Sequence, residues 1–499
     1  MQRRHFLGLT AAAALGQTAP AIAALQGTSP LHELGLAAAA RAIRDGDISS
    51  ETYVGTLLER TRAQAELKAF ITIDEDAVRE GARSADRARR TGHAAPLLGV
   101  PLAVKDSYLT RGLTTTFGTS VLAGFKPARD AAAVAALRNA GAIVFGKNSL
   151  AEMSYGLTGH NAHHGQVRNP YDRAHVTGGS SSGAGASVAA RLVPAALGGD
   201  TVGSIRVPAS LCGVVGFKPT PGRWSGEGVA PISETLDTTG VLARHVEDCE
   251  LLDTLMTKRA APASNARAGL AGVRVAHAPR QYLAEVNGDV DAAFRDTLRK
   301  LEDAGATIVE VDLGEDFMAL AARSTWPIFF HETMPALQAF LAANDVPASF
   351  EQIYEGLGPQ IREAWSRAVV PSAPGHVSVE KYRAALRGRA ELRRRLASSA
   401  FARADAMLFP TTPCAAPRID SQWQFEVGGM TVTDLFLSRH THPSSCAGGP
   451  GVSLPMALNA HGLPLGLELD AAPGRDRELL ALARRVERLL GRLPAPAAL

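Results

Sequence analysis

The stretch Gly178-Gly179-Ser180-Ser181-Ser182-Gly183-Ala184-Gly185 is followed, 24 residues after Ser180, by Gly203-Ser204-Ile205-Arg206-Val207-Pro208. Glycine, serine and alanine dominate residues 177–216, a composition that is also typical of flexible linkers. The segment nevertheless carries apolar side chains that a solvated linker does not need, at Val188, Leu192, Val193, Leu197, Ile205, Val214 and Val215. We therefore predict a compact core here, because glycine lets backbone segments approach closely.

Short apolar runs alternate with helical segments on both sides of this core. Residues 97–104 form an apolar run that ends at Lys105, so a strand is expected to deliver that lysine. Residues 131–140 indicate a helix stopped by Gly141, and residues 142–145 indicate the next strand. Residues 273–276 and 307–311 indicate two strands around a helix near 291–304. The alternation predicts a layered α/β fold.

Three other segments have helical patterns. Residues 31–92 are rich in Ala, Arg and Glu, with Asp47 and Ser49 as candidate N-caps. Residues 479–490 carry apolar side chains at helical spacing behind a predicted Asp476 cap. Residues 317–396 are also expected to be helical, and we interpret their aromatic side chains chiefly as core packing; these are Trp326, Phe329, Phe330, Tyr354 and Trp365.

The bulk composition excludes some classes of protein. The chain has 499 residues, of which 46% are hydrophobic and 20% charged, so it is not disordered. A net charge of +3 supplies no basic field, and we expect no nucleic-acid partner. The four cysteines show no metal-binding spacing and are expected to be mostly small buried apolar residues: Cys212, Cys249, Cys414 and Cys446.

The N-terminus has the pattern of an export signal. Arg3-Arg4 precedes a short apolar stretch, and Ala21-Ile22-Ala23 offers a cleavage site. The paired arginines indicate a Tat-type signal over residues 1–23 and a periplasmic or secreted protein. The alternative is an Ala-rich terminal helix. No other stretch approaches the roughly 18 apolar residues of a membrane helix, so no membrane insertion is expected after cleavage.

Two catalytic motifs match imperfectly. Gly141-Ala142-Ile143-Val144-Phe145-Gly146-Lys147-Asn148 is close to a phosphate-binding loop, but Asn148 stands where Ser or Thr would hold magnesium, and strand-forming residues fill the loop. Residues 179–183 contain a G-x-S-x-G frame centred on Ser181, yet a polar segment precedes it where the α/β-hydrolase elbow needs a strand. We interpret the first as a strand end and the second as a weak match.

The same stretch, taken whole with Cys212-Gly213-Val214-Val215-Gly216-Phe217-Lys218-Pro219-Thr220, closely resembles the amidase signature. Pro101-Leu102-Ala103-Val104-Lys105-Asp106 resembles the upstream lysine strand of that family, and residues 409–413 and 462–469 match its C-terminal segments. The resemblance spans about residues 30–490. Within the family, residues 152–158, 222–224 and 231–240 resemble the indoleacetamide and mandelamide hydrolases.

The resemblance implies an amidase signature fold of the α/β class, with a large mixed β-sheet covered by helices on both faces. After the signal, residues 24–499 would form a single domain. The catalytic core would occupy about 96–260, a variable helical substrate region about 317–396, and C-terminal strands and a helix about 401–491.

The resemblance also assigns roles to residues. Ser204 would be the nucleophile, Ser180 the bridging serine in a cis peptide, and Lys105 the base. A lysine can act as a base only when neutral, and burial on an apolar strand favours that form. The oxyanion hole would be formed by backbone N–H groups of Thr201, Val202, Gly203 and Ser204, and the substrate would be bound by Ser154, Tyr155 and Gly156.

Three positions depart from the family pattern. Ser182 and Ala184 replace glycines of the serine loop, and Val202 stands where the family usually has glycine beside the oxyanion hole. A β-branched residue restricts the backbone there. These changes put the rate or the pocket shape in question, while the three catalytic side chains are intact.

His160, His163 and His164 could suggest a metal site, but no Cys, Asp or Glu next to them in the sequence completes one. We expect a solvated or pocket-rim loop, no metal and no cofactor. The predicted function is therefore a serine-dependent amidase that converts a small, aryl-substituted amide to acid and ammonia or amine through an acyl-enzyme, as a monomer or homodimer. Alternatives are ester, carbamate or anilide hydrolysis, or a catalytically impaired binding protein.

Overall fold

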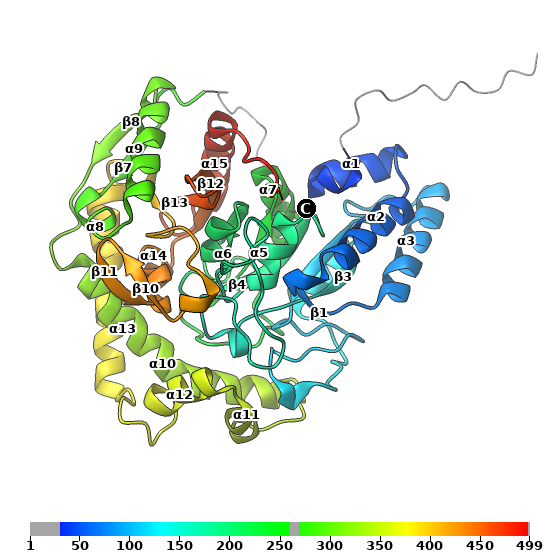
Figure 1. Cartoon of the computed structure of the whole chain (residues 1–499), viewed down its shortest axis with the longest axis horizontal. Helices are drawn as coiled ribbons and strands as arrows, with labels where there is room; N and C mark the ends of the chain where they lie inside the picture. Colours follow the sequence, from blue (N-terminus) through cyan, green and yellow to red (C-terminus); the bar gives the residue numbers. More distant parts are fainter. Residues whose placement is uncertain (1–29, 260–268, 498–499) are drawn as a thin grey trace, which may run out of the picture.

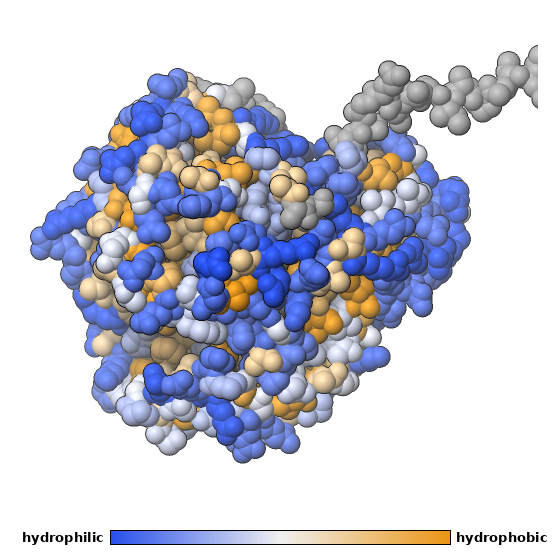
Figure 2. All heavy atoms as spheres, in the orientation of Figure 1, coloured by the Kyte–Doolittle hydropathy of each residue, from blue (hydrophilic) through white to orange (hydrophobic). Residues whose placement is uncertain are grey.

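The computed structural model describes residues 30–259 and 269–497. The predicted export signal at 1–23 lies outside the described residues, as does nearly all of the predicted surface connection at 260–269. No helix within the described ranges is both long and apolar enough to cross a bilayer. Figure 2 shows a face covered mainly by hydrophilic residues, with apolar ones in small groups.

A single large sheet runs through the molecule, and in the described part of the chain it has 11 strands (Figure 1). In their order across the sheet the strands are β1 (Phe70–Thr72), β3 (Ile143–Asn148), β2 (Pro101–Lys105), β4 (Ala195–Asp200), β6 (Thr238–Ala243), β5 (Val215–Lys218), β12 (Gly451–Leu458), β13 (Pro464–Asp470), β9 (Ala406–Pro410), β7 (Arg274–His277) and β8 (Thr307–Glu310). A separate hairpin consists of β10 (Gln424–Val427) and β11 (Met430–Thr433).

The sheet is mixed. Strand β2 pairs in parallel with β3 and β4, and β7 pairs in parallel with β8 and β9. The pairs from β4 through β6, β5, β12 and β13 to β9 are antiparallel. The register of β4 and β6 places Asp200 opposite Thr238, which brings the end of β4 beside the residues that precede β6.

Helices surround this sheet. They are α1 (Leu36–Asp45), α2 (Ser50–Ala63), α3 (Glu75–Arg90), α4 (Ala132–Asn139), α5 (Ser182–Ala189), α6 (Arg206–Leu211), α7 (Val246–Thr257), α8 (Pro279–Tyr282), α9 (Gly288–Asp303), α10 (Phe317–Ala343), α11 (Phe350–Gly356), α12 (Pro359–Ala368), α13 (Val379–Arg395), α14 (His442–Ala447) and α15 (Asp476–Leu490). Helices α10 to α13 gather along the lower left of Figure 1, and α1 to α3 lie at the opposite side.

The small-residue core predicted at 177–216 is present as two short helices pressed onto the sheet. Every residue of α5 and α6 is buried. A Cβ added to Gly466 of β13 would lie 2.4 Å from Ser210 Oγ of α6, so only glycine allows this approach. Because side chains alternate along a strand, Leu465 and Leu467 point to the opposite face, where the sheet packs against other helices. The expected α/β fold with a large mixed sheet is confirmed.

Two local predictions were wrong. The segment 31–92 is interrupted by β1, which adds an edge strand beside β3, although Ser49 does cap α2 by accepting from Thr52 N. Asp476 is the first residue of α15 and does not cap it. Its carboxylate instead accepts hydrogen bonds from the backbone N and the hydroxyl of Thr220, at 2.8 and 2.7 Å, so it joins this helix to the loop after β5.

All four cysteines are buried and unpaired. The aromatic residues of 317–396 divide into two groups. Trp365 and Phe329 are buried, whereas Trp326, Phe330 and Tyr354 are only partly covered.

Candidate active site

Lys105 is the last residue of β2, and its side chain is 1% exposed. Its strand is buried between β3 and β4, so the lysine is delivered into the interior by backbone pairing on both sides. Its Nζ donates a hydrogen bond of 2.8 Å to Ser180 Oγ. The structure therefore brings together two residues that are 75 positions apart in the chain.

The serine loop is fixed by backbone contacts. The Gly179–Ser180 peptide is cis. The Ser180 carbonyl accepts a hydrogen bond from Ala151 N at 3.1 Å, and Ser181 N donates to the Ser204 carbonyl at 3.2 Å. This last bond ties the loop that carries Ser180 directly to the turn that carries Ser204.

Ser204 lies in the tight turn between β4 and α6. Gly203 has a φ of +143°, and a Cβ at this position would lie 2.2 Å from Thr441 Oγ1, so the turn requires glycine. Thr441 Oγ1 donates to the Val202 carbonyl at 2.6 Å and fixes the other side of the turn. Within the described part of the chain, the N–H groups of Val202, Gly203 and Ser204 donate no hydrogen bond. They are free to bind an oxyanion.

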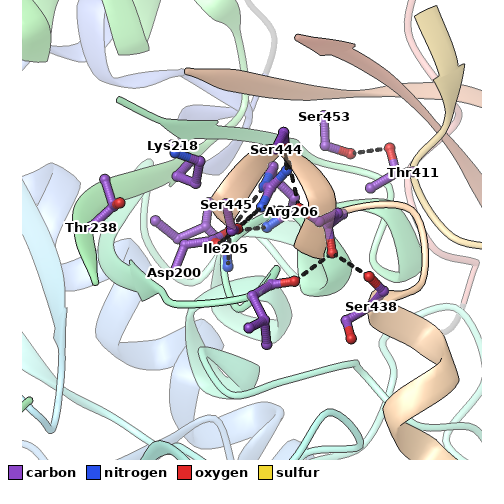
Figure 3. A network of polar contacts seen from close by, with 12 residues as sticks. Asp200, Ile205, Arg206, Lys218, Thr238, Thr411, Ser438, Ser444, Ser445 and Ser453 are labelled. Carbon is purple, nitrogen blue, oxygen red and sulfur yellow. Dashed lines mark hydrogen bonds and ion pairs between the residues drawn. The ribbon is translucent and has the colours of Figure 1, made fainter. Parts of the chain in front are cut away.

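A buried ionic network supports this turn (Figure 3). Arg206, at the start of α6, bonds both carboxylate oxygens of Asp200, at 3.0 and 3.1 Å. It also contacts Glu468 of β13 at 3.2 Å and donates to the hydroxyls of Ser444 and Ser445 in α14. Asp200 additionally accepts from Ile205 N at 3.1 Å. The last residue of β4, the turn, α6 and α14 are thus held by one guanidinium.

A cavity of about 330 Å³ reaches Lys105. Its wall includes Ser154, Thr201 and Asp237, together with apolar side chains such as Trp224, Val229 and Ile232. Asp237 comes directly before β6 and accepts a hydrogen bond of 2.6 Å from Thr201 Oγ1. Ser180 and Ser204 adjoin this wall through their contacts with Lys105 and the 201–204 turn.

The electrostatics of the cavity favour a neutral lysine. Burial lowers the pKa of Lys105 to about 7, although the negative charges of Asp237 and Asp200 oppose this shift. Burial raises the pKa of Asp237 to about 6, against the hydrogen bonds and the Lys105 charge that favour its ionised form. Near neutral pH the lysine can therefore give up its proton without a large penalty.

The three predicted substrate-binding residues lie in different environments. Ser154 lines the cavity. Tyr155 is buried, with its ring against Phe329 and Trp365, at centroid distances of 5.0 and 5.3 Å, and its hydroxyl bonded to Thr333. The Gly156 carbonyl packs against Gly179, where an added Cβ would lie 2.8 Å away. Of the three, the Ser154 side chain is the one on the cavity wall, while Tyr155 and Gly156 support the site from behind.

The competing motifs have structural explanations. Ser181 follows a loop, not a strand, and its hydroxyl is bound to the backbone of Gly199. Lys147 ends the near-phosphate-loop motif inside β3, where it forms a buried ion pair with Asp106 at 3.5 Å. Neither group is arranged as its motif would require.

The histidine segment needs a correction. The sequence shows no acidic residue beside it, but Glu152 accepts a bond of 2.9 Å from His163 Nε2 and another of 2.9 Å from Gly358 N. Across the described ranges, no group of three His, Cys, Asp or Glu side chains is placed to hold a metal. The 3-10 turn at 152–154 creates this contact by turning the chain back, which spacing alone does not reveal.

Sequence reasoning also missed the roles of Asp237, Asp200 and Arg206. All three stand in segments used for the resemblance, but no spacing indicated that Asp237 meets Thr201 or that Arg206 meets Glu468. These contacts arise from the β4–β6 register and from the packing of α6 on β13. They need the fold.

The profile of the family described as Amidase matches residues 53–480. Because this match covers most of the chain, the chain belongs to the amidase family, and it is a hydrolase that acts on amide bonds.

Individual relatives agree with this assignment. The chain is 38% identical over 483 residues to the mandelamide hydrolase of Pseudomonas putida, with 93% of both chains covered. It is 33% identical to the indoleacetamide hydrolase of Allorhizobium ampelinum, covering 90% of this chain and 95% of that one. It is also 34% identical to a glutamyl-tRNA(Gln) amidotransferase subunit of Roseiflexus castenholzii, covering 92% and 96%. A crystal structure of an amidase matches with a TM-score of 0.81 at 32% identity, covering 92% of this chain and 100% of that one. The resemblance to mandelamide and indoleacetamide hydrolases is confirmed.

Proposed function

We propose that this chain hydrolyses a small aryl-substituted carboxylic amide through an acyl-enzyme on Ser204, with Ser180 and Lys105 moving the protons. The observation that carries the proposal is the 2.8 Å bond from a fully buried lysine to Ser180, next to the turn that holds Ser204. A buried lysine whose pKa is lowered to about 7 is able to accept a proton, which an exposed lysine does poorly.

The acylation step follows from these positions. Ser204 Oγ attacks the carbonyl carbon and passes its proton to Ser180, while Ser180 passes its own proton to Lys105. The free N–H groups of Val202, Gly203 and Ser204 stabilise the developing oxyanion. Ser180 then protonates the leaving nitrogen and recovers a proton from Lys105. The C–N bond breaks and leaves an ester on Ser204.

Deacylation uses the same groups. Water attacks the ester carbonyl, and its proton travels through Ser180 to Lys105. The tetrahedral intermediate collapses, the Ser204 oxygen leaves with a proton returned through Ser180, and the acid is released. Atoms balance as amide plus water giving acid plus ammonia or amine.

An aryl acyl group is supported by contacts beside the oxyanion turn. Trp326 of α10 is partly exposed, stacks on Phe330 and contacts the His442 ring at a centroid distance of 6.0 Å. His442 directly follows Thr441, whose hydroxyl holds the Val202 carbonyl. Partly exposed aromatic rings thus lie close to the predicted oxyanion hole. The relatives named for mandelamide and indoleacetamide, both aryl amides, agree with this substrate class.

Two further activities have specific support. The same site geometry could cleave an ester, carbamate or anilide, since the nucleophile does not select the leaving group. Similarity to the glutamyl-tRNA(Gln) amidotransferase protein favours an ammonia-supplying role, but the Arg3-Arg4 signal argues for an exported protein that would be separated from a tRNA-modifying assembly. We propose a periplasmic or secreted location on the same ground.

A substrate panel tests the proposal. Ammonia release is measured for mandelamide, indoleacetamide, phenylacetamide, short aliphatic amides and glutamine, and acid release is measured for the matched ester and carbamate. We expect the highest kcat/KM among the aryl amides. A preference for glutamine would instead support an amidotransferase role, and a preference for the ester or carbamate would overturn the amide assignment of this site.

A further inference from the structure

Asp237 joins three parts of the site through a single carboxylate. One oxygen accepts the 2.6 Å bond from Thr201 Oγ1, at the start of the oxyanion turn. The other accepts from Ile232 N at 2.8 Å and from Ser233 N at 3.1 Å, in the loop that forms another wall of the cavity. The catalytic steps above do not use this residue, yet it lies on the same cavity wall as Lys105.

The charged groups around this cavity leave Asp237 and Lys105 as natural partners. The titratable side chains on the wall are those of Lys105, Asp200, Glu234 and Asp237. Asp200 is neutralised by the buried Arg206, and Glu234 is exposed to solvent. Facing the pair from neighbouring elements are the hydroxyls of Tyr108 and Tyr155 and, from α10 behind the loop, the Glu332 carboxylate, which is bonded to Ser233 and Thr235.

We propose that Asp237 is a positioning residue that links the oxyanion turn to the protonation of Lys105. Its carboxylate holds Thr201, and so the turn with the free N–H groups, while its negative charge sets the pH at which the lysine becomes neutral. This inference rests on the proposed role of Lys105 as the base.

The sign of the effect follows from electrostatics. A carboxylate near an ammonium favours the charged form of the lysine and raises its pKa. Removing the Asp237 charge therefore lets Lys105 become neutral at lower pH. The acid limb of the kcat/KM profile, where activity is lost as pH falls through the lysine pKa, moves to lower pH. A residue that is merely structural would lower activity without moving this limb.

The test compares matched variants by pH profile. Asp237→Asn removes the charge but keeps an oxygen that can accept from Thr201, and we expect the acid limb to move down by about one pH unit. Glu234→Gln removes a charge from the exposed rim of the same cavity and should move the limb by less than about 0.3 units, because solvent screens it. An unshifted limb in Asp237→Asn, or an equal shift in Glu234→Gln, would overturn the proposal.

The hydrogen bond is tested separately, which also covers the case that Asp237→Asn does not fold. Thr201→Val removes the donor at constant shape and charge, and Thr201→Ser restores it. We expect kcat in Thr201→Val to fall at least about tenfold with little change in KM, as for lost oxyanion stabilisation, and to recover in Thr201→Ser. Unchanged kcat in Thr201→Val would contradict the positioning role.

One control separates this inference from the proposed function. Lys105→Ala should be inactive at all pH values. If Lys105→Ala keeps its activity, the proposed mechanism fails and the Asp237 inference fails with it. If Lys105→Ala is inactive while the Asp237→Asn limb stays in place, the inference alone fails.

Discussion

At the scale of single residues, Val202 is the departure with the clearest chemical consequence. It is 4% exposed and, unlike the neighbouring Gly203, does not have a positive φ. Its carbonyl is held by Thr441, so its N–H and side chain have little freedom to rearrange. We infer that the isopropyl group narrows the space available to the acyl part of the substrate.

Val202→Gly should therefore increase kcat/KM more for bulky acyl groups than for small ones. The free energy of unfolding should fall by at least about 1 kcal/mol, because glycine adds entropy to the unfolded chain and a buried side chain is lost. The measurement is kcat/KM over a series of amides of rising acyl size in both proteins. Equal changes across the series would point to a general loss of oxyanion stabilisation and would refute the narrowing.

Residue chemistry was partly predictable from the sequence. The resemblance placed Lys105 and Ser180 together, and the structure has them in hydrogen-bond contact. It gave no role to Asp237, whose partners lie 36 and 5 residues away and meet it only through the strand register. It also gave Asp476 the wrong partner, because a short acidic residue before a helical pattern is equally suited to a tertiary contact.

At the scale of elements, one carboxylate attaches the variable helices to the catalytic core. Glu332 of α10 accepts hydrogen bonds from Thr235 N at 3.0 Å, Thr235 Oγ1 at 2.6 Å and Tyr382 Oη of α13 at 2.7 Å, and it also bonds Ser233 Oγ. The loop at 231–236 that it holds forms part of the cavity wall. The position of α10 and the shape of the site are therefore coupled.

Glu332→Ala should lower the free energy of unfolding by roughly 2–4 kcal/mol, because four donors lose a charged acceptor. KM for aryl amides should rise more than kcat falls, since the aromatic side chains of α10 move relative to the site. Tyr382→Phe is the matched control, which removes one donor and should cost about 1 kcal/mol. Urea unfolding and steady-state kinetics measure both. A loss below about 0.5 kcal/mol in Glu332→Ala would show that the helices are attached elsewhere.

The alternation of elements was predictable, but their arrangement was not. Apolar periodicity located β2, β3, β7 and β8 within a few residues. It missed β1, a strand of 3 residues that is too short to show alternation. The order of β4, β6, β5 and β12 could not be read from the sequence, because antiparallel pairing between segments far apart in the chain leaves no local trace.

At the scale of the whole molecule, the question is how the folded chain reaches its compartment. We propose Tat export, which transports folded proteins, on the strength of Arg3 and Arg4. The fold agrees with folding before export, since all four cysteines are buried without disulfides. No oxidising compartment is needed to complete the structure.

Replacing Arg3 and Arg4 together by lysine keeps the charge and the apolar stretch but removes the paired guanidinium groups. We expect the variant to remain in the cytoplasm, unprocessed and fully active in a lysate assay. Fractionation with an immunoblot against the mature chain measures this. Normal processing and periplasmic recovery of the double-lysine variant would mean that a general secretory route carries the protein, which would then have to fold after export.

The central claim is that Ser204 is the residue acylated during turnover. The most direct measurement is to react the enzyme with a fluorophosphonate and to locate the adduct by peptide mass spectrometry in the unaltered protein, in Ser204→Ala and in Ser181→Ala. The account predicts one adduct, on Ser204, which is lost in Ser204→Ala and retained in Ser181→Ala. An adduct on Ser181, or an active enzyme that gains no adduct on Ser204, would contradict it.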